Sequence, residues 1–297
     1  MKKFIKTCLI AGIITLIVGG AITIAAASFG ASIWDIAPDE AAFWKRTFSD
    51  ISFKNMDLND GTDYLMEFQI KEPDQTGEEI YVTDQARSLS AEVRGGKVFL
   101  KEDPNVDGIT IYCNKENGNW DIKEKNGKLK LTVGEKPMED NSDLIITVSV
   151  PEEFHFSDLD LEVSRKKGFL KKEKSAPILS ARSIKADEMD LEVNAGILSI
   201  EEGDVKNLTF ENSVGAVVYD GNATGDIKGE CNVGAVKLNL SGEKEDYNYQ
   251  VECRLGEIKI GQEQISAVNN EVNYNNMADK NINLECNTGA IEVNFTH

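Results

Sequence analysis

A glycine-centred repeat in the second half of the chain constrains its fold more than any other feature. In each copy a glutamate stands four residues before a glycine, and apolar residues alternate with polar ones on both sides. The five copies are LEVNAGILSI, FENSVGAVVY, GECNVGAVKL, VECRLGEIKI and LECNTGAIEV, centred on Gly196, Gly215, Gly234, Gly256 and Gly289. One such unit cannot bury its apolar face alone, whereas stacked copies share a core. The repeat therefore predicts an all-β fold, a single-stranded β-solenoid in which short strands stack as in a β-helix.

The spacing of the repeat fits one coil per copy. The glycines follow one another at intervals of 19, 19, 22 and 33 residues, and 19 residues at ~3.3 Å per residue trace roughly 60 Å of chain. The glycine allows a bend between two short strands, where a Cβ would clash. We expect the copies to stack in sequence order, with Gln262–Lys280 forming a projecting loop or a degenerate coil.

The two-residue period of a strand assigns the repeat positions to faces. The positions three and one before the glycine, and two and four after it, are mostly apolar and are expected to face inward. The glutamates are expected to form one outward column, made of Glu192, Glu211, Glu230, Glu252 and Glu285. Because these carboxylates repel one another, the column is either a solvated acidic face or a face that binds cations such as Ca²⁺. Lys237 and Lys259 are expected to offset part of its charge.

Three cysteines share one inward position of the repeat: Cys231, Cys253 and Cys286. Stacking of successive coils would bring Cys231 within ~4.8 Å of Cys253, which borders on disulfide geometry. Reduced thiols that fill the core are the alternative that we favour. No histidine accompanies them, so no metal site or cofactor is expected.

The first half of the body also alternates. The segments ITIYCN, KLKLTV and LIITVSV have the period of half-buried strands. Asn126-Gly127 is a strong signal for a two-residue hairpin, and Pro151 is expected to end a strand because it has no amide donor. No helical stretch of useful length follows Asp50.

An uncharged segment of 28 residues, Thr7–Trp34, precedes the body. It exceeds the roughly 20 residues that span a bilayer as a helix. Three lysines precede it and an acidic body follows, so the positive-inside rule places the N-terminus in the cytoplasm and the body outside the cell membrane. The alternative is a signal peptide that is cleaved after Ala25–Ala27. Both alternatives export the body.

These features divide the chain into four parts. Residues 1–34 are expected to be a cytoplasmic tip and a transmembrane signal anchor, and residues 35–51 a juxtamembrane stalk. Residues 52–155 are expected to be an N-terminal β section, and residues 156–297 the repeat section.

The charge balance limits the partners. The chain has 51 acidic and 32 basic residues, a net charge of −19. Such a surface repels phosphates, so no nucleic-acid partner is expected. One basic run stands out against this background, with Arg165, Lys166, Lys167, Lys171, Lys172 and Lys174. It is a candidate contact for an anionic polymer or lipid, and the alternative is an ordinary exposed loop.

Catalytic signals are sparse. Solenoid enzymes that cleave polysaccharides use paired acids, and Asp158 with Asp160, or Asp187 with Asp190, would be the candidates here. The sequence does not distinguish these residues from turn aspartates. The two histidines stand alone, without an interpretable catalytic spacing. We therefore expect no enzyme activity.

The chain resembles the bacterial putative-adhesin family, a domain family of unknown function. The resemblance rests on the N-terminal anchor, on the strand that ends at Val150-Pro151, and on the glycine units that end in TGAIEVNF. It implies a β-solenoid at the Gram-positive cell envelope that binds or scaffolds a cell-wall polymer or a partner membrane protein. Some members accompany envelope-stress sensors, so an accessory role in such a system is the alternative. The resemblance carries over no binding residue.

Overall fold

The described part of the chain is all-β apart from one short 3₁₀ turn. The computed structural model describes residues 51–53, 68–70, 77–94, 96–115, 120–133, 144–164, 178–194 and 196–296. β1 and β2 form a small antiparallel sheet, and the other strands form one sheet of 15 strands. The predicted anchor (residues 1–34) and nearly all of the stalk (35–51) lie outside the described residues.

The strands are β1 (Ile51–Phe53), β2 (Phe68–Ile70), β3 (Glu78–Thr83), β4 (Ser88–Arg94), β5 (Lys97–Glu102), β6 (Ile109–Cys113), β7 (Trp120–Lys125), β8 (Lys128–Val133), β9 (Ile145–Val150), β10 (His155–Ser164), β11 (Ile178–Arg182), β12 (Lys185–Val193), β13 (Gly196–Ala223), β14 (Ile227–Ser241), β15 (Tyr247–Ile260), β16 (Glu263–Tyr274) and β17 (Lys280–Thr296).

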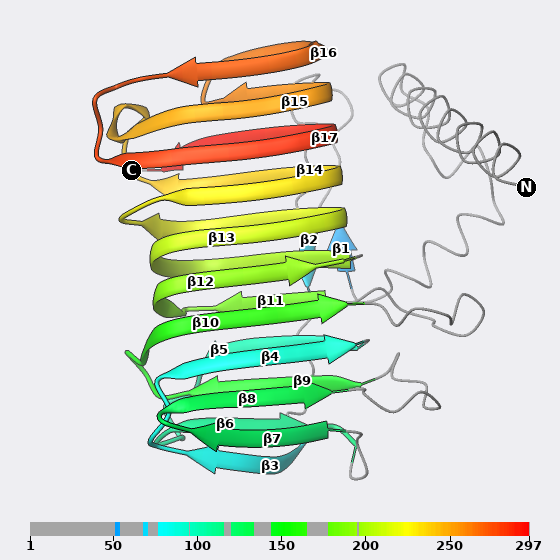
Figure 1. Ribbon diagram of the computed structural model, residues 1–297, viewed down its shortest axis with the longest axis vertical. Helices are drawn as coiled ribbons and strands as arrows, with labels where there is room; N and C mark the ends of the chain where they lie inside the picture. The colour runs from blue at the N-terminus through cyan, green and yellow to red at the C-terminus, as the bar shows by residue number, and fades with distance from the viewer. Residues whose placement is uncertain are drawn as a thin grey trace, which may run out of the picture.

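The sheet is built from two-armed coils that lie one on another (Figure 1). In each coil a first arm precedes the repeat glycine and a second arm follows it. The first arms of neighbouring coils pair in parallel, as β10 does with β12 and β12 with β13, and the second arms do the same, as in β11 with β13. β10 also pairs with β4, so strands from both predicted body sections share this sheet.

The repeat glycines form a continuous column at the bend between the two arms. Gly215 is in register with Gly234, Gly234 with Gly289, and Gly289 with Gly256. A Cβ on Gly234 would lie 1.7 Å from the carbonyl oxygen of Gly215, and its φ of +145° is one that residues with a Cβ rarely adopt. The bend therefore requires glycine, and the predicted stacking of the glycines is observed.

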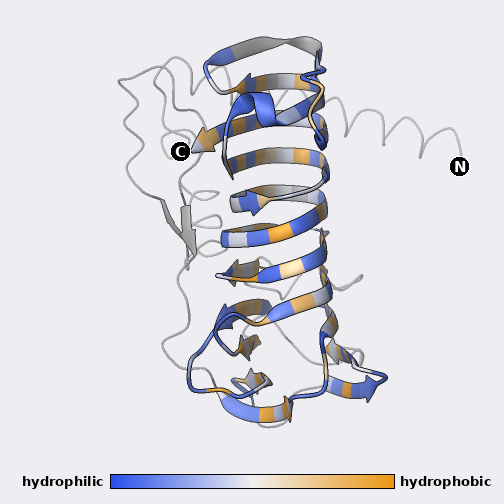
Figure 2. Cartoon of the chain, turned by 90° about the vertical axis from the view of Figure 1, so that its left-hand side faces the viewer, coloured by the Kyte–Doolittle hydropathy of each residue, from blue (hydrophilic) through white to orange (hydrophobic). Residues whose placement is uncertain are grey.

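The core lies between the two arms. Apolar and polar residues alternate along the strands (Figure 2), which places every second side chain inside. The positions two and four after the glycine are buried throughout, as predicted: Leu198, Val217, Val236, Ile258 and Ile291, and then Ile200, Tyr219, Leu238, Ile260 and Val293.

The inward prediction for the position one residue before the glycine failed at Val233. Val233, one residue before its glycine, is 47 % exposed. The positions three before and two after the glycine, Cys231 and Val236, are both buried, although they stand five positions apart and strict alternation would place them on opposite faces. The alternation must therefore break once between them. The break lies at the bend around Gly234, and it turns Val233 outward.

The order of the coils also differs from the sequence order. β17, the last strand, lies between β14 and β15, in parallel register with both. At the other end β4 and β5 lie between β8–β9 and β10–β11, although they precede both in the chain. Each terminal coil of the described body is thus enclosed by coils on both sides.

Antiparallel strands close both ends of the stack. β7 pairs with β8, β6 with β9 and β3 with β6 at one end, and β16 pairs with β15 at the other. Residues 262–280, predicted as a loop or a degenerate coil, contain β16 and its connection to β17.

The short local signals were correct. Asn126 and Gly127 have φ angles of 53° and 74° and join β7 to β8 in an antiparallel hairpin. β9 ends at Val150, directly before Pro151.

Candidate functional site

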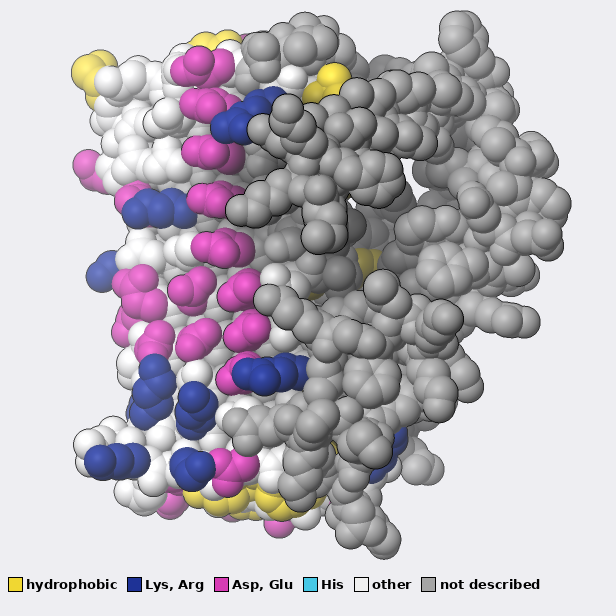
Figure 3. All heavy atoms as spheres, turned by 45° about the vertical axis from the view of Figure 1, so that its right-hand side comes forward, with side chains coloured by type: hydrophobic (Ala, Val, Ile, Leu, Met, Phe, Trp, Pro, Cys, Tyr) yellow, Lys and Arg dark blue, Asp and Glu magenta, His cyan; other side chains and the backbone are white. Residues whose placement is uncertain are grey.

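Eight glutamates form one continuous row across the outer face of the first arms. We call this row the glutamate ladder. Each member is in register with the next on the neighbouring strand, in the order Glu92, Glu162, Glu192, Glu211, Glu230, Glu285, Glu252 and Glu271. Neighbouring strands lie ~4.8 Å apart, so the row is roughly 34 Å long. Figure 3 shows acidic side chains following one another along this face.

The ladder contains all five glutamates predicted from the repeat and three more. Glu162 comes from β10, where the segment LEVS begins as a repeat unit does but no glycine follows at the repeat spacing. Glu92 was missed, although it stands four residues before Gly96 in SAEVRGGKVFL, with Val93 buried beside it as in the repeat. Glu271 belongs to the antiparallel β16, where a repeat read in the forward direction cannot find it.

The ladder widens into a block of carboxylates on β10 and β12. Asp158, Asp160 and Glu162 are in register with Glu188, Asp190 and Glu192. The two aspartates proposed as a catalytic pair, Asp158 and Asp160, lie on alternate outward positions of one strand and not in a turn. Six acidic groups therefore share two neighbouring strands at the middle of the face.

Desolvation and crowding of like charges raise the pKa of several of these groups. Desolvation, followed by repulsion from Glu192 and Glu92, raises the pKa of Glu162. Desolvation and Asp160 raise the pKa of Asp190. Desolvation, with Glu192 and Glu230, raises the pKa of Glu211. The face thus holds its negative charge at an energetic cost that a positively charged partner would relieve.

Few described cations offset the block. One of them is Lys128, which lies 3.0 Å from Asp158. Glu188 accepts a hydrogen bond from the uncharged amide of Asn207 at 2.8 Å. The predicted offset by Lys237 and Lys259 is wrong. Both lie beyond the glycine bend, on the second arm, where they contact Glu292 at 3.9 and 2.8 Å.

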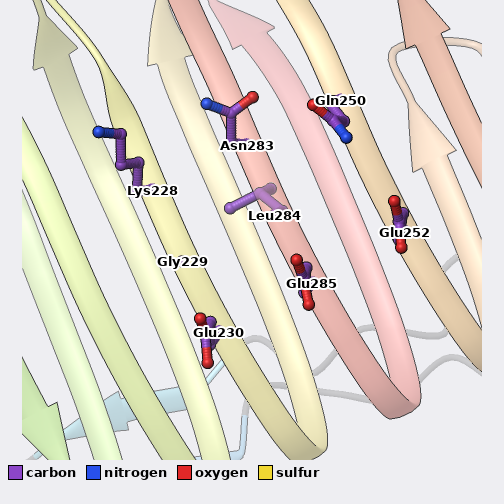
Figure 4. Close-up of a pocket in the computed structure, with 8 residues that line it drawn as sticks. All are labelled: Lys228, Gly229, Glu230, Gln250, Glu252, Asn283, Leu284 and Glu285. Carbon is purple, nitrogen blue, oxygen red and sulfur yellow. The ribbon is translucent and has the colours of Figure 1, made fainter.

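A shallow hollow of about 210 Å³ lies on the ladder where β14, β17 and β15 meet. Figure 4 shows Glu230, Glu285 and Glu252 on these three strands, with a polar row, Lys228, Asn283 and Gln250, two residues earlier on each. Small-molecule pockets usually measure 300–1,000 Å³ and are mostly apolar. The hollow is smaller and polar, so it favours surface contact over enclosure of a small ligand.

An amide row runs parallel to the ladder and stabilises the turn into the first arm. Asn207 donates to Glu188, the amide N–H of Asp226 donates to Asn207, and Asn281 donates to Asp226 at 2.8 Å. Asn248 donates to Asn281 at 3.0 Å. Sequence reasoning did not identify this row, because its members fall outside the ten-residue repeat units. Its bonds fix the coils in register and so hold the ladder straight.

The cysteine column is buried and reduced. Cys286 lies in register between Cys231 and Cys253, so the predicted direct contact of Cys231 with Cys253 is wrong. The insertion of β17 separates them. All three are free thiols, as is Cys113. The hydrogen bond with Cys231, together with burial, raises the pKa of the Cys286 thiol to about 12.

Other predicted features lie outside the described residues. These are the basic residues Arg165, Lys166, Lys167, Lys171, Lys172 and Lys174 and the apolar segment Thr7–Trp34. Among the described residues no helix is long and apolar enough to cross a membrane. Within the same residues no group of three or more His, Cys, Asp or Glu side chains has the arrangement of a metal site.

Comparisons with known proteins find similar solved structures, but no similar sequence. No family model and no curated protein matches the chain. A crystal structure of a putative cell adhesion protein from Clostridium sporogenes is 14% identical, with a TM-score of 0.37, over 74% of this chain and 99% of that one. A putative adhesin from Bacteroides fragilis is 12% identical, with a TM-score of 0.32, over 73% and 97%.

A third similar structure is named differently. It is a putative lipid binding protein from Parabacteroides distasonis, 10% identical with a TM-score of 0.26, over 74% of this chain and 96% of that one. All three TM-scores lie below 0.5, so these similarities assign the chain to no family.

Proposed function

We propose that this chain is a membrane-anchored, extracytoplasmic β-solenoid that acts as a binding or scaffold module of the bacterial cell envelope. The observation that carries the proposal is the glutamate ladder, eight carboxylates in register on eight successive strands. The ladder is the contact surface, and its partner is an extended, positively charged polymer or surface.

The ladder suits a multivalent partner. A single exposed ion pair contributes only about 0–1 kcal/mol. Eight carboxylates along roughly 34 Å let a partner with many positive charges form several such pairs at once. Its charges also relieve the repulsion that, after desolvation, helps to raise the pKa values of Glu162 and Glu211. Contacts of this kind weaken with salt, because ions screen exposed charges beyond a Debye length of about 8–10 Å.

The rigidity of the face supports the same proposal. In the described part of the chain every ladder strand except β16 is paired on both sides, and the amide row holds successive coils in register. A rigid row loses little conformational entropy when it binds. The export of the body is inferred from the uncharged segment Thr7–Trp34 and the lysines before it. No described residue favours polysaccharide cleavage or a role beside a stress sensor.

Binding of the purified full chain to poly-lysine, measured at low and high salt, tests the proposal. We expect salt-sensitive binding to poly-lysine and no binding to poly-glutamate. The variant E162Q/E192Q/E211Q removes three neighbouring ladder charges and should weaken binding at least tenfold. The control variant E152Q/E245Q/D279N removes the same total charge from exposed positions off the ladder and should bind like the wild type.

Two results would overturn this function. One is equal loss of binding in both triple variants, which would mean that net charge alone attracts the polymer. The other is unchanged binding in the ladder variant. Binding to isolated cell walls with and without Ca²⁺ then identifies whether a divalent ion competes for the ladder or bridges it to an anionic wall polymer.

A further inference from the structure

Within the described residues, β16 leaves one long edge of the sheet unpaired at the end of the stack. This strand has 12 residues, and in the described part of the chain it pairs only with β15. Its other edge faces away from the coils (Figure 1). A row of backbone N–H and C=O groups along such an edge is a template for another strand.

At the opposite end of the stack the edge strands carry features that block pairing with another strand, and β16 lacks these features. β7 has six residues, WDIKEK, of which four are charged, and β3 contains an irregularity between Glu79 and Tyr81. Tyr81 donates a hydrogen bond to Glu124 at 2.9 Å, which ties β3 to β7. Short charged strands and bulges are the devices that block edge pairing. β16, EQISAVNNEVNY, contains no Lys, Arg, Pro or Gly.

β16 also follows the outline of a coil. It pairs with both arms of β15, from Tyr249 opposite Tyr274 to Ile260 opposite Glu263. The Tyr274 hydroxyl donates to Glu263 at 2.6 Å although eleven residues separate the two, so the strand bends around the core until its ends meet. The edge is therefore shaped to receive one further coil-shaped strand.

We propose that this edge pairs with the same edge of a second copy of the chain, antiparallel and end to end. In the register that uses all 12 residues, the two-fold axis passes between Val268 and Asn269. Such an interface is isologous and closed, so it yields a dimer and not a filament. The inference is independent of the proposed ligand of the ladder.

The residues of β16 are self-complementary in this register. Glu263 faces Tyr274 of the second copy, and Ser266 faces Glu271 of the second copy, so no two carboxylates oppose each other. Ile265 faces Val272 of the second copy, and both stand at register positions opposite the buried Ile258 and Val251 of β15. The pairing thus places two apolar residues opposite each other, at register positions next to buried residues of β15. The six-residue β7 edge offers a second copy half this length.

Sedimentation of the purified full chain over a concentration series tests the proposal. We expect a reversible dimer of twice the chain mass of 32.8 kDa. S266E places a like-charge pair at two symmetric points of the interface and should weaken the dimer about tenfold. S213E makes the same change on the internal strand β13 and should leave the dimer unchanged.

A second variant separates the interface from stability. Within one copy residues 266 and 271 oppose Glu257 and Glu252 of β15 and not each other. They oppose each other only across the dimer, and S266E/E271K should therefore restore it. Unfolding midpoints measured on dilute protein check that all variants are folded. A wild type that stays monomeric, a dimer that S266E leaves intact, or no rescue by the double variant would each overturn the proposal.

Discussion

The carbonyl oxygen of Gly234 lies 1.6 Å from the point that a Cβ on Gly289 would occupy, although 55 residues separate the two glycines. This contact exists because the last coil enters the stack between β14 and β15. Gly289 also has a φ of +145°, so any other residue is strained there whatever the space.

Replacement of Gly289 by alanine should therefore destabilise the chain by about 3 kcal/mol or more, from overlap and backbone strain together. Chemical denaturation of the full chain measures the loss. G261A is the matched control, since Gly261 has a positive φ of 57° but no atom within 4 Å of the added Cβ. That control should lose only about 1–2 kcal/mol. Equal losses in the two variants would refute the close approach of the glycines.

The same substitution at two glutamates of β17 should have different effects on the stability of the chain. Glu292 is 5 % exposed and lies 2.8 Å from Lys259, with Lys237 at 3.9 Å on the other side. E292Q leaves two partly buried lysines without a countercharge and should cost about 1–3 kcal/mol. E285Q removes one of the eight ladder carboxylates and should leave stability unchanged or raise it slightly. Denaturation midpoints compare them, and a greater loss for E285Q would contradict the assignment.

Acidification should stabilise the chain before it destabilises it. The pKa values of Glu162, Asp190 and Glu211 are raised in the folded state. Their contribution to stability is complete below the ordinary values of 4.5 for Glu and 3.8 for Asp, and is lost as the pH rises through the folded pKa. The thermal midpoint should therefore rise as the pH falls from 7 to about 5.

The triple variant E162Q/D190N/E211Q is the control for this pH response. It should be more stable than the wild type at pH 7 and should show a flatter profile between pH 7 and about 5. The lowered pKa values of Asp103 and Glu263 act only below their ordinary values of 3.8 and 4.5, so they do not mask the effect. A wild-type midpoint that falls steadily over this interval would contradict the prediction.

Alkali should act through buried tyrosines. Burial raises the pKa of Tyr247 to about 12 and raises those of Tyr219 and Tyr249 as well. In the unfolded chain these hydroxyls ionise near pH 10. Their contribution to stability is present below that value and is lost as the pH rises through about 12. Tyrosinate absorbance should show these groups ionising together with unfolding.

The variant Y219F tests the buried hydroxyl directly. Tyr219 donates to the main-chain carbonyl of Asn222 at 2.6 Å. Its loss should cost about 1 kcal/mol at neutral pH and should remove one group from the alkaline transition. Early ionisation of all tyrosines in the folded chain would show that these side chains are solvent-accessible.

Much of the local structure was predictable because it depends on neighbouring residues. The Asn126-Gly127 hairpin requires positive φ angles that these residues tolerate, and the outward direction of Glu192 and Glu211 follows from the period of a strand. The inward prediction for Val233 failed because the bend at Gly234 shifts the alternation by one residue. Glu92 was predictable from Gly96 and was overlooked.

By itself the sequence determined the all-β class, the glycine bend and the column that holds five of the eight ladder glutamates, since periodic residues dictate their own faces. Only the tertiary structure decided that Gly289 stacks on Gly234 and that Gly256 follows it. The physical reason is that equivalent repeats fit equivalent slots, so the motif cannot specify its neighbour. Contacts that differ from copy to copy, such as Lys259 with Glu292, distinguish otherwise equivalent slots, and they form only in the folded stack.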